Sequence, residues 1–518
     1  MTSSTAPRTA PWWAGAISGF LAAAAGLAVG TGVSALLTGV PSPVESVGNR
    51  AIDYAPPFLK DFAIEQFGTN DKPVLIAGVV ATLAVVAMLA GVVGRTRPRT
   101  ALGVIAVLGL VAVAAAATDR TATASRALTL VPTLVTVAVA VGAMVLLLRR
   151  MGRAVTEAHP LSTGFDRRGF LITAAGLTAL AAVGGTVSRA VGGAAAAASR
   201  AGIRLPRPAR PADPVPAGAQ VDVKGVSSYL TSNKDFYRVD TALRVPDVPA
   251  EGWQLRIHGL VDREVTLSYR EVMDMPLVER RVTLTCVSNE VGGPYVGNAT
   301  WLGVLTKDLL ERAGVQSEAD AVKSTSADGW TAGTPIEALT DDRSSLLAIG
   351  MNGEPLPLIH GFPARLVVPG LYGYVSATKW LTDLEVTRFS DFEAYWTPRG
   401  YSAKAPIKFS SRIDVPGAFQ ELPRDKVRVG GVAWAQTVGI EKVEVQVDNG
   451  PWQLADLATE DTTETWRQWS WQWDDATEGS HRLTVRATTK DGTTQTSDRA
   501  RIRPDGTTGW HSVQFRVA

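Results

Sequence analysis

The chain has 518 residues, of which 46% are hydrophobic and 19% are charged, and its formal net charge is only +2. Such a small charge, without a basic stripe interleaved with aromatic residues, argues against a nucleic-acid partner. A single cysteine, Cys286, excludes an intramolecular disulfide. The length corresponds to three or four domains of ordinary size.

The N-terminal part of the chain contains five apolar, almost uncharged runs, at residues 12–40, 73–94, 101–117, 128–148 and 169–187. Most of them are long enough to cross a hydrocarbon core of about 30 Å as helices. Residues 1–195 are therefore predicted to form a membrane anchor of about five transmembrane helices. The runs contain no His, Cys, Asp, Glu or Lys. The anchor thus lacks ligands for a haem within the membrane and ionisable residues for an ion path.

Arginines gather in two loops between these runs, at residues 95–99 and at the two ends of the segment 149–168. Because Lys and Arg accumulate on the cytoplasmic side, both loops are predicted to be cytoplasmic. Five spans then place everything after about residue 195 on the other side. The chain is expected to be a multi-pass protein of the cytoplasmic membrane with its C-terminal part on the extracytoplasmic side.

The run Asp166-Arg-Arg-Gly-Phe-Leu-Ile172 precedes the last apolar stretch and looks like a twin-arginine export signal. Asp166 and Ile172 depart from that signal, in which Ser or Thr and Lys are frequent at these positions. The two arginines are equally well explained as positive-inside anchors. Small residues at 194–198 would permit cleavage, whereas the four upstream spans favour retention.

The remaining residues divide into three segments. Residues 196–222 are rich in Ala, Arg and Pro without apolar periodicity, and are predicted to be a tether. Residues 223–423 mix strand-like stretches, such as 253–257 and 265–269, with helical ones, such as 305–312, which predicts an α+β domain. Within it, the Asn352-Gly353 pair between apolar runs predicts a hairpin.

Residues 424–518 show alternating patterns at 443–447, 469–473 and 483–487, with turn residues between them. About seven such strands without a helix predict an immunoglobulin-like β-sandwich. Its tryptophans are expected in the core, because a disulfide-free sandwich needs large apolar groups.

Cys286 lies in the run Arg281-Val-Thr-Leu-Thr-Cys-Val-Ser-Asn289. It is either a small buried hydrophobic residue or a thiolate that binds a metal or attacks a substrate. Further runs follow in the order Trp301-Leu-Gly, Met351-Asn-Gly-Glu-Pro-Leu, His360-Gly-Phe-Pro-Ala-Arg365, Leu366-Val-Val-Pro-Gly-Leu-Tyr-Gly373 and Thr378-Lys-Trp380. Together with Cys286 they resemble the molybdopterin domain of the sulfite oxidase family. The part after residue 424, ending in Trp510-His-Ser-Val, resembles that family's dimerisation domain.

The resemblance implies a molybdenum-molybdopterin cofactor with one pterin, in which the Cys286 thiolate joins two dithiolene sulfurs on the metal. It also implies that His360, Arg365 and Lys379 bind the phosphate and the polar edge of the pterin. Structural alternatives are a turn residue for His360 and a strand-edge charge for Arg365. The other residues that the resemblance carries over are Phe236, Tyr237, Asn289 and Thr378 for the cofactor, and Arg238 and Tyr401 for the catalytic centre.

Two positions depart from the family pattern. Asp240 stands where sulfite oxidases have a cofactor-contacting His, and Val291 stands where they have an arginine that clamps the anionic substrate. The loss of that arginine weakens the case for sulfite, although Arg238 could supply one positive contact. Tyr401 is either an active-site phenol or a packing residue. The substrate is therefore a small oxyanion or an S- or N-oxide, and both redox directions stay open.

The electron path is not evident in this chain. It has neither a Cys-x-x-Cys-His motif nor a His-Pro-Gly-Gly motif, so no haem is expected in it. Electrons are expected to pass to a separate carrier, either a haem protein or a membrane subunit. A homodimer through the β-sandwich is what the resemblance implies.

The leading hypothesis is a membrane-anchored molybdenum oxidoreductase that performs two-electron oxygen-atom transfer at Cys286 outside the cytoplasm. Two other classes stay open. One is a thiol hydrolase that uses Cys286 and a histidine. The other is a non-enzymatic surface protein that binds partners through the β-sandwich. Both alternatives predict a protein without molybdenum.

Overall fold

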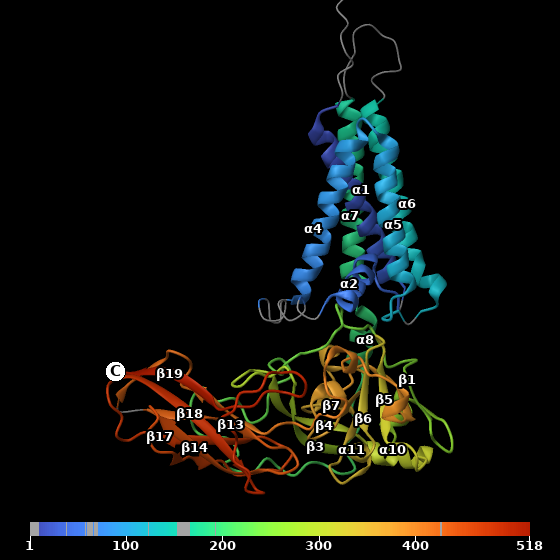
Figure 1. Cartoon of the computed structure of the whole chain (residues 1–518). Coiled ribbons are helices and arrows are strands. Elements are labelled where there is room, and N and C mark those ends of the chain that lie inside the picture. Colours follow the sequence, from blue (N-terminus) through green and yellow to red (C-terminus); the bar gives the residue numbers. More distant parts are fainter. Residues whose placement is uncertain are drawn as a thin grey trace, which may run out of the picture. The chain divides into compact units, whose positions relative to one another are not determined.

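The computed structural model describes residues 10–37, 39–56, 59, 66, 71–122, 124–152, 166–191, 193–424 and 427–518 (Figure 1). They fall into two compact units. The first comprises the residues up to Ala195 together with Ala242–Asp247, and the second comprises Ala196–Thr241 together with Val248–Ala518. Residues 1–9 of the expected membrane anchor lie outside the described residues.

The first unit is helical. Its helices are α1 (Trp12–Ala35), α2 (Pro43–Tyr54), α4 (Asp71–Gly94), α5 (Pro98–Ala117), α6 (Arg126–Gly152) and α7 (Arg167–Val191). Helix α1 packs against α4, α6 and α7. Glycines permit this close approach, since a Cβ atom on Gly19 would lie 1.8 Å from the carbonyl oxygen of Ala87 on α4. Small residues at helix contacts are typical of helix packing in lipid.

Among the described residues, five helices are long and apolar enough to cross a membrane, at Trp12–Ala35, Lys72–Gly94, Pro98–Ala117, Arg126–Met151 and Arg167–Ser188. They coincide with the five apolar runs of the sequence. The short helix α2 is of another kind, because it is polar and begins with a capping box. The Ser42 hydroxyl accepts the Glu45 N–H, and the Glu45 carboxylate accepts the Ser42 N–H at 2.7 Å.

The α+β part of the second unit is built on two sheets within the described ranges. One sheet has the order β2-β1-β10-β5-β6, with β1 (Gln254–Gly259), β2 (Val265–Ser268), β5 (Ala321–Ser326), β6 (Thr331–Pro335) and β10 (Leu381–Thr387). The other has the order β3-β4-β7-β8, with β9 paired to β7, and its strands are β3 (Val278–Thr285), β4 (Val296–Leu305), β7 (Leu346–Met351), β8 (Glu354–Pro355) and β9 (Arg365–Val367). The connections contain α9 (Tyr269–Met273), α10 (Thr306–Ala313) and α11 (Glu337–Thr340), and the 3-10 turns η3 (Leu358–His360), η4 (Gly373–Val375), η5 (Phe389–Asp391) and η6 (Thr397–Arg399).

Local sequence signals explain several of these elements. Asn352 and Gly353 both have positive φ, 51° and 82°, and they join β7 to β8 as the predicted hairpin turn. Helix α10 agrees with the predicted helical stretch, residues 305–312, to within one residue at each end, and it is followed by Gly314 in the left-handed conformation. One core of apolar side chains from both sheets, including Leu255, Trp301 and Leu366, fills the domain.

The segment 196–222, which was expected to be a tether, is bound to the α+β domain along part of its length. Helix α8 (Ala194–Gly202) begins it, and Arg200 on this helix donates hydrogen bonds to the Leu356 carbonyl at 2.8 Å and to the Glu354 carboxylate at 2.7 Å. Farther on, the Ala209 N–H donates to the Leu277 carbonyl at 2.8 Å. Proline-rich backbone has few regular partners, so composition alone suggested a free linker.

The C-terminal part consists of strands only in two sheets, within residues 410–424 and 427–518. Their orders are β11-β13-β17-β16 and β12-β19-β18-β14-β15. The strands are β11 (Ser410–Val415), β12 (Glu421–Leu422), β13 (Arg428–Trp434), β14 (Ile440–Val447), β15 (Gln453–Leu454), β16 (Asp456–Leu457), β17 (Arg467–Gln472), β18 (Gly479–Thr489) and β19 (His511–Val517).

Side chains from both of these sheets form one core that contains Trp469, Val485 and Phe515, as expected for a sandwich. The immunoglobulin-like topology remains a prediction. The sheets also begin earlier than the expected boundary at residue 424, because β11 pairs with β13 and β12 pairs with β19. The two-sheet unit therefore starts by Ser410, and we refer to residues 410–518 as the sandwich.

Candidate functional site

A pocket with about 900 Å³ of empty space lies within the second unit. It brings together side chains from segments far apart in the sequence. Of the ten residues that the resemblance carried over, those that line the pocket are Phe236, Tyr237, Cys286, His360, Arg365, Lys379 and Tyr401.

Cys286 follows the last residue of β3, and it faces this pocket. Its N–H donates to the Tyr295 carbonyl at 3.0 Å, and its Sγ accepts the Ser288 N–H at 3.4 Å. The residue is only 8% exposed, and burial raises the pKa of its thiol. A nucleophilic cysteine needs a base at hydrogen-bond distance. In the described part of the chain, no histidine is hydrogen-bonded to this sulfur.

Arg365 is a buried cation, 5% exposed, at the start of β9. Its guanidinium donates to the carbonyls of Leu366 and His360, at 3.2 Å each, and lies 5.0 Å from the centroid of the Trp301 ring. Among the described residues no carboxylate pairs with it. Burial lowers its pKa to about 10, so it stays charged at neutral pH. A buried charge without a counter-ion is costly, and an incoming anion would remove that cost.

Lys379 and Asp240 form a second charged group in the pocket, and their charges compensate each other. The Lys379 Nζ lies 2.6 Å from Asp240 Oδ2, and both side chains are at most 10% exposed. Burial lowers the pKa of Lys379 to about 8, although the Asp240 carboxylate opposes that shift. Arg238 also donates to Asp240, at 2.9 Å, but Arg238 does not line the pocket. Asp240, which stands where the family has a histidine, therefore pairs with both Lys379 and Arg238.

His360 and the adjacent aromatic residues form the wall near Arg365. The His360 Nε2 lies 2.9 Å from the Asn233 carbonyl, so Nε2 carries the proton and Nδ1 is left as an acceptor. Burial lowers the pKa of His360 to about 4, which keeps the ring neutral at physiological pH. Phe236 packs between this ring and Tyr237, with centroid distances of 5.6 Å and 5.2 Å.

Another part of the wall is aromatic. Tyr401 lies 5.4 Å from Tyr374 and 5.2 Å from Trp396 between ring centroids, and all three line the pocket. The Tyr374 hydroxyl donates to the Ser402 carbonyl at 2.7 Å. Tyr401 therefore belongs both to the pocket and to an aromatic cluster, which combines the two alternatives that the sequence left open.

Asn289 and Thr378 do not line the pocket, and their side chains have structural partners. The Asn289 Oδ1 accepts the Tyr295 N–H at 2.7 Å and so closes the loop after Cys286. The Thr378 hydroxyl lies 2.6 Å from the Ser324 hydroxyl in the core. Their assignment to the cofactor rested on motif position, which does not show the direction of a side chain.

Sequence reasoning missed Asp328 and Trp330, which line the pocket from the turn between β5 and β6. Asp328 is 5% exposed, and its Oδ1 accepts the Trp330 N–H at 3.1 Å. The Asp328-Gly329 pair between two strand-like runs signals a turn but gives no indication of a pocket. Only the pairing of β5 with β10 brings this turn close to Lys379 and Trp380.

These features fit the group that the resemblance implies. A molybdopterin needs one protein thiolate, a cation for its phosphate and polar partners for its pterin. Cys286, the neutral His360 and Arg365, which has no carboxylate partner among the described residues, all line this pocket and offer these groups. Lys379 fits less simply, because its charge is already balanced by Asp240. The donor set is therefore compatible with the cofactor, with Arg365 as its main anionic anchor.

Comparison with known proteins agrees with this chemistry. Residues 242–396 match the family model of the oxidoreductase molybdopterin binding domain. The chain is 38% identical over 179 residues to the uncharacterized oxidoreductase YuiH of Bacillus subtilis (strain 168), which covers 34% of this chain and 87% of YuiH.

The chain is also 29% identical over 288 residues to mitochondrial sulfite oxidase of Homo sapiens, which covers 47% of this chain and 52% of that protein. It therefore spans about half the length of that sulfite oxidase. Among solved structures, the sulfane dehydrogenase SoxCD from Paracoccus pantotrophus matches with a TM-score of 0.50 and 21% identity, over 57% of this chain and 82% of that chain. At this identity the match shows a shared fold alone.

Proposed function

This chain belongs to the family of sulfite-oxidase-type molybdopterin oxidoreductases, and we propose that it is a membrane-anchored member that transfers an oxygen atom to or from a small sulfur or nitrogen compound outside the cytoplasm. The observation that carries this proposal is a pocket lined by both Cys286 and Arg365, a buried cation that has no carboxylate partner among the described residues. Burying such a cation in a pocket is costly unless an anion binds there, which favours a cofactor site over a surface protein without a cofactor.

The roles of the residues follow from their contacts. We assign Cys286 to the metal and Arg365 to the phosphate of the pterin, with His360, Phe236 and Tyr237 along its ring system. The bound cofactor would supply the two-electron chemistry, while the protein supplies position and electrostatics. Asn289 and Thr378 then act indirectly, by fixing the loop after Cys286 and the segment before Lys379.

The charges of the pocket favour a substrate without net negative charge. Arg238 and Lys379 are both paired with Asp240, and Arg365 is assigned to the cofactor. Asp328 adds a buried negative charge to the pocket wall, and Val291 replaces the arginine that clamps sulfite in sulfite oxidases. Among the described residues that line the pocket, a dianion such as sulfite would find no cation that is not already paired or assigned to the cofactor.

The aromatic side chains support the same choice. Trp330, Trp396 and Tyr401 offer apolar surface to the organic group of a substrate. We therefore favour an organic S- or N-oxide over sulfite. Its polar oxygen would lie near the Tyr401 hydroxyl, which is able to donate a hydrogen bond.

The proposed location rests on the five apolar helices and on the arginines in the loops between them. By the positive-inside rule, the catalytic part lies on the extracytoplasmic side. The twin-arginine motif at the start of α7 is consistent with export of a folded, cofactor-loaded domain. Electrons are proposed to pass to or from a separate haem protein or membrane subunit, and homodimerisation through the sandwich is carried over from the family.

Elemental and pterin analysis tests this function. The full chain is purified in detergent from cells that synthesise the cofactor, as wild type and as Cys286→Ser. We expect about one molybdenum per wild-type chain. We expect pterin to be largely retained in Cys286→Ser, because Arg365 is untouched. A folded wild-type protein without metal and pterin would leave the thiol-hydrolase and binding-protein hypotheses. Turnover of sulfoxides, N-oxides and sulfite with a redox dye then tests the substrate class.

A further inference from the structure

The sandwich contacts β3, the strand that directly precedes Cys286. In β3, Arg281, Thr283 and Thr285 alternate, so their side chains lie on the same face of the strand. All three are at most 8% exposed. In the sheet order, β3 is an edge strand that pairs with β4. Edge strands of this kind need a cover for their free backbone groups.

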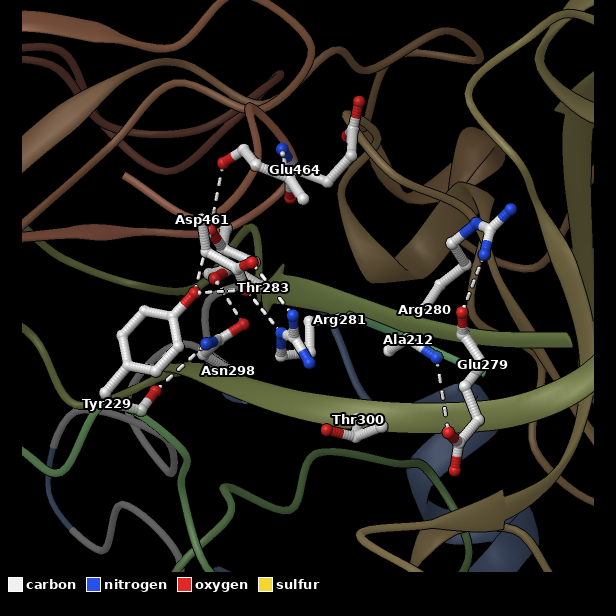
Figure 2. A network of polar contacts seen from close by, with 12 residues as sticks. Ala212, Tyr229, Glu279, Arg280, Arg281, Thr283, Asn298, Thr300, Asp461 and Glu464 are labelled. Carbon is white, nitrogen blue, oxygen red and sulfur yellow. Dashed lines mark hydrogen bonds and ion pairs between the residues drawn. The ribbon is translucent and has the colours of Figure 1, made fainter. Parts of the chain in front are cut away.

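Residues of the sandwich supply that cover (Figure 2). The Arg281 guanidinium donates to Asp461 Oδ1 at 2.8 Å. The Thr283 N–H donates to the Glu464 carbonyl at 3.0 Å, and the Thr283 hydroxyl accepts the Trp466 N–H at 2.7 Å. Strand β3 is thus bound to the loop before β17 through both its backbone and its side chains.

Gln436, just after β13, strengthens this attachment close to the cysteine. Its Nε2 donates to the Thr283 carbonyl at 3.0 Å and lies 3.4 Å from the Thr285 hydroxyl. Gln436 is only 6% exposed, and Thr285 directly precedes Cys286. The sandwich therefore holds the backbone of β3 at Thr283 and contacts the side chain of Thr285, one residue before the thiol.

The sandwich also holds the loop after Cys286. The Thr507 hydroxyl donates to the Asn289 carbonyl at 2.9 Å, and Arg412 on β11 donates to the Gly293 carbonyl at 3.0 Å. Gly292, with φ of +83°, packs so closely on His511 that a Cβ atom would lie 2.2 Å from the imidazole Nε2. Cys286 consequently sits between two segments that are both attached to the sandwich.

We propose that the sandwich positions the Cys286 thiol for the metal, with Gln436, Thr283 and Thr507 as positioning residues, in addition to any role in dimerisation. That this thiol binds a metal rests on the proposed function. A metal ligand on an edge strand and a loop would otherwise shift with local opening of either segment. Hydrogen bonds to both segments restrict that opening, because each must break before the thiol moves.

Cys286 is the only cysteine, so thiol labelling reports on this position alone. The experiment measures iodoacetamide alkylation of molybdenum-free full-length protein in detergent, for wild type, Gln436→Leu, Thr283→Val and Thr507→Val. We expect each variant to react about three- to tenfold faster than wild type, as the loss of one buried hydrogen bond implies. Thr283→Ser keeps the hydroxyl, so it should be alkylated at the wild-type rate, unlike Thr283→Val. Thr507 is at the edge of the contact, so its variant tests the idea even if the core variants do not fold.

The matched control is Glu444→Gln in the same sandwich. It removes an ion pair with Arg486, 3.0 Å long, that does not contact β3. This variant should label at the wild-type rate even if it lowers the melting temperature. The proposal is overturned if Thr283→Val and Thr507→Val lower the melting temperature but are alkylated at the wild-type rate. The sandwich would then have a stabilising role only.

A second readout uses the cofactor-loaded protein. The positioning variants should bind molybdenum but show an altered electron paramagnetic resonance spectrum of the reduced metal, and the Glu444→Gln spectrum should be unchanged. A spectrum identical to wild type in Thr283→Val and Thr507→Val would contradict positioning. Absence of molybdenum from wild type would instead contradict the proposed function, while the alkylation rates still decide whether the sandwich holds the thiol.

Discussion

Arg281 on β3 and Asp461 in the loop before β17 form an ion pair in which the side chains are only 6% and 4% exposed (Figure 2). The Tyr229 hydroxyl donates to the same carboxylate at 2.8 Å, so Asp461 serves two donors. The pair joins the α+β domain to the sandwich five residues before Cys286. A buried pair of this kind is costly to break from one side, because the remaining charge stays in the interior.

Replacing Asp461 with asparagine should destabilise the second unit. The change keeps the shape of the side chain but leaves the Arg281 guanidinium without a counter-ion, a loss of about 3–5 kcal/mol for a buried pair. Thermal unfolding followed by circular dichroism measures it as a lower melting temperature. Glu460→Gln is the control, because the neighbouring Glu460 pairs with Lys490 at a more exposed site. It should change stability by less than about 1 kcal/mol. Equal melting temperatures for both variants would contradict a structural role of the buried pair.

Glu464, in the same loop, should make stability depend on pH. Burial raises its pKa to about 7 from an ordinary value of 4.5, and its Oε2 atom has no hydrogen-bond partner. The folded state therefore favours the protonated form. That stabilising contribution is complete below about pH 4.5 and is lost as the pH rises through about 7. Glu464→Gln should be more stable than wild type at pH 8, by roughly 1–3 kcal/mol, and similar to it near pH 4.5. A stability difference that is independent of pH would refute the shift.

The sequence predicted those elements that local signals specify. The Asn352-Gly353 turn needs only its own positive φ angles, and α10 ends at a glycine, so both were predictable from short stretches. The residues Cys286, His360 and Arg365 were identified from family motifs. All three line the same pocket.

What the sequence could not predict depends on pairing between distant segments. The boundary at residue 424 was placed too late because β11 differs from the earlier strands only through its partner β13. The segment 196–222 is bound by donors and acceptors of the α+β domain, such as Leu277 and Glu354, that its own composition does not reveal. Asp328 looked like an ordinary turn residue, since nothing in the sequence shows that this turn lies beside Lys379.

Arg365 should be the residue on which pterin retention depends most. Replacing it with methionine removes the buried cation but keeps a side chain of similar length that can still pack on Trp301. We expect the loss of one charge-assisted contact, about 1.5–3 kcal/mol, which corresponds to roughly 10- to 100-fold weaker binding. Pterin fluorescence of the purified protein after dialysis measures it. Arg256→Met, at an exposed pair with Glu264, is the control and should retain pterin as wild type does. Full pterin content in Arg365→Met would assign the anionic anchor to another residue.

Asp328 should select against anionic substrates. Asp328→Asn keeps an oxygen that can accept the Trp330 N–H but removes the buried negative charge from the pocket wall. The change should remove about 1–2 kcal/mol of repulsion between the carboxylate and sulfite. We therefore expect kcat/KM for sulfite to rise by roughly 5- to 30-fold. If sulfite is not turned over, its potency as a competitive inhibitor of sulfoxide turnover should rise by the same factor. Turnover of an uncharged sulfoxide should change by less than about twofold, because it has no net charge to be repelled. Glu264→Gln removes a carboxylate of the same domain that does not line the pocket, and it should affect neither substrate. If Asp328→Asn lowers turnover of both substrates equally, Asp328 takes part in the reaction itself or in shaping the pocket, and the charge of the substrate is selected elsewhere.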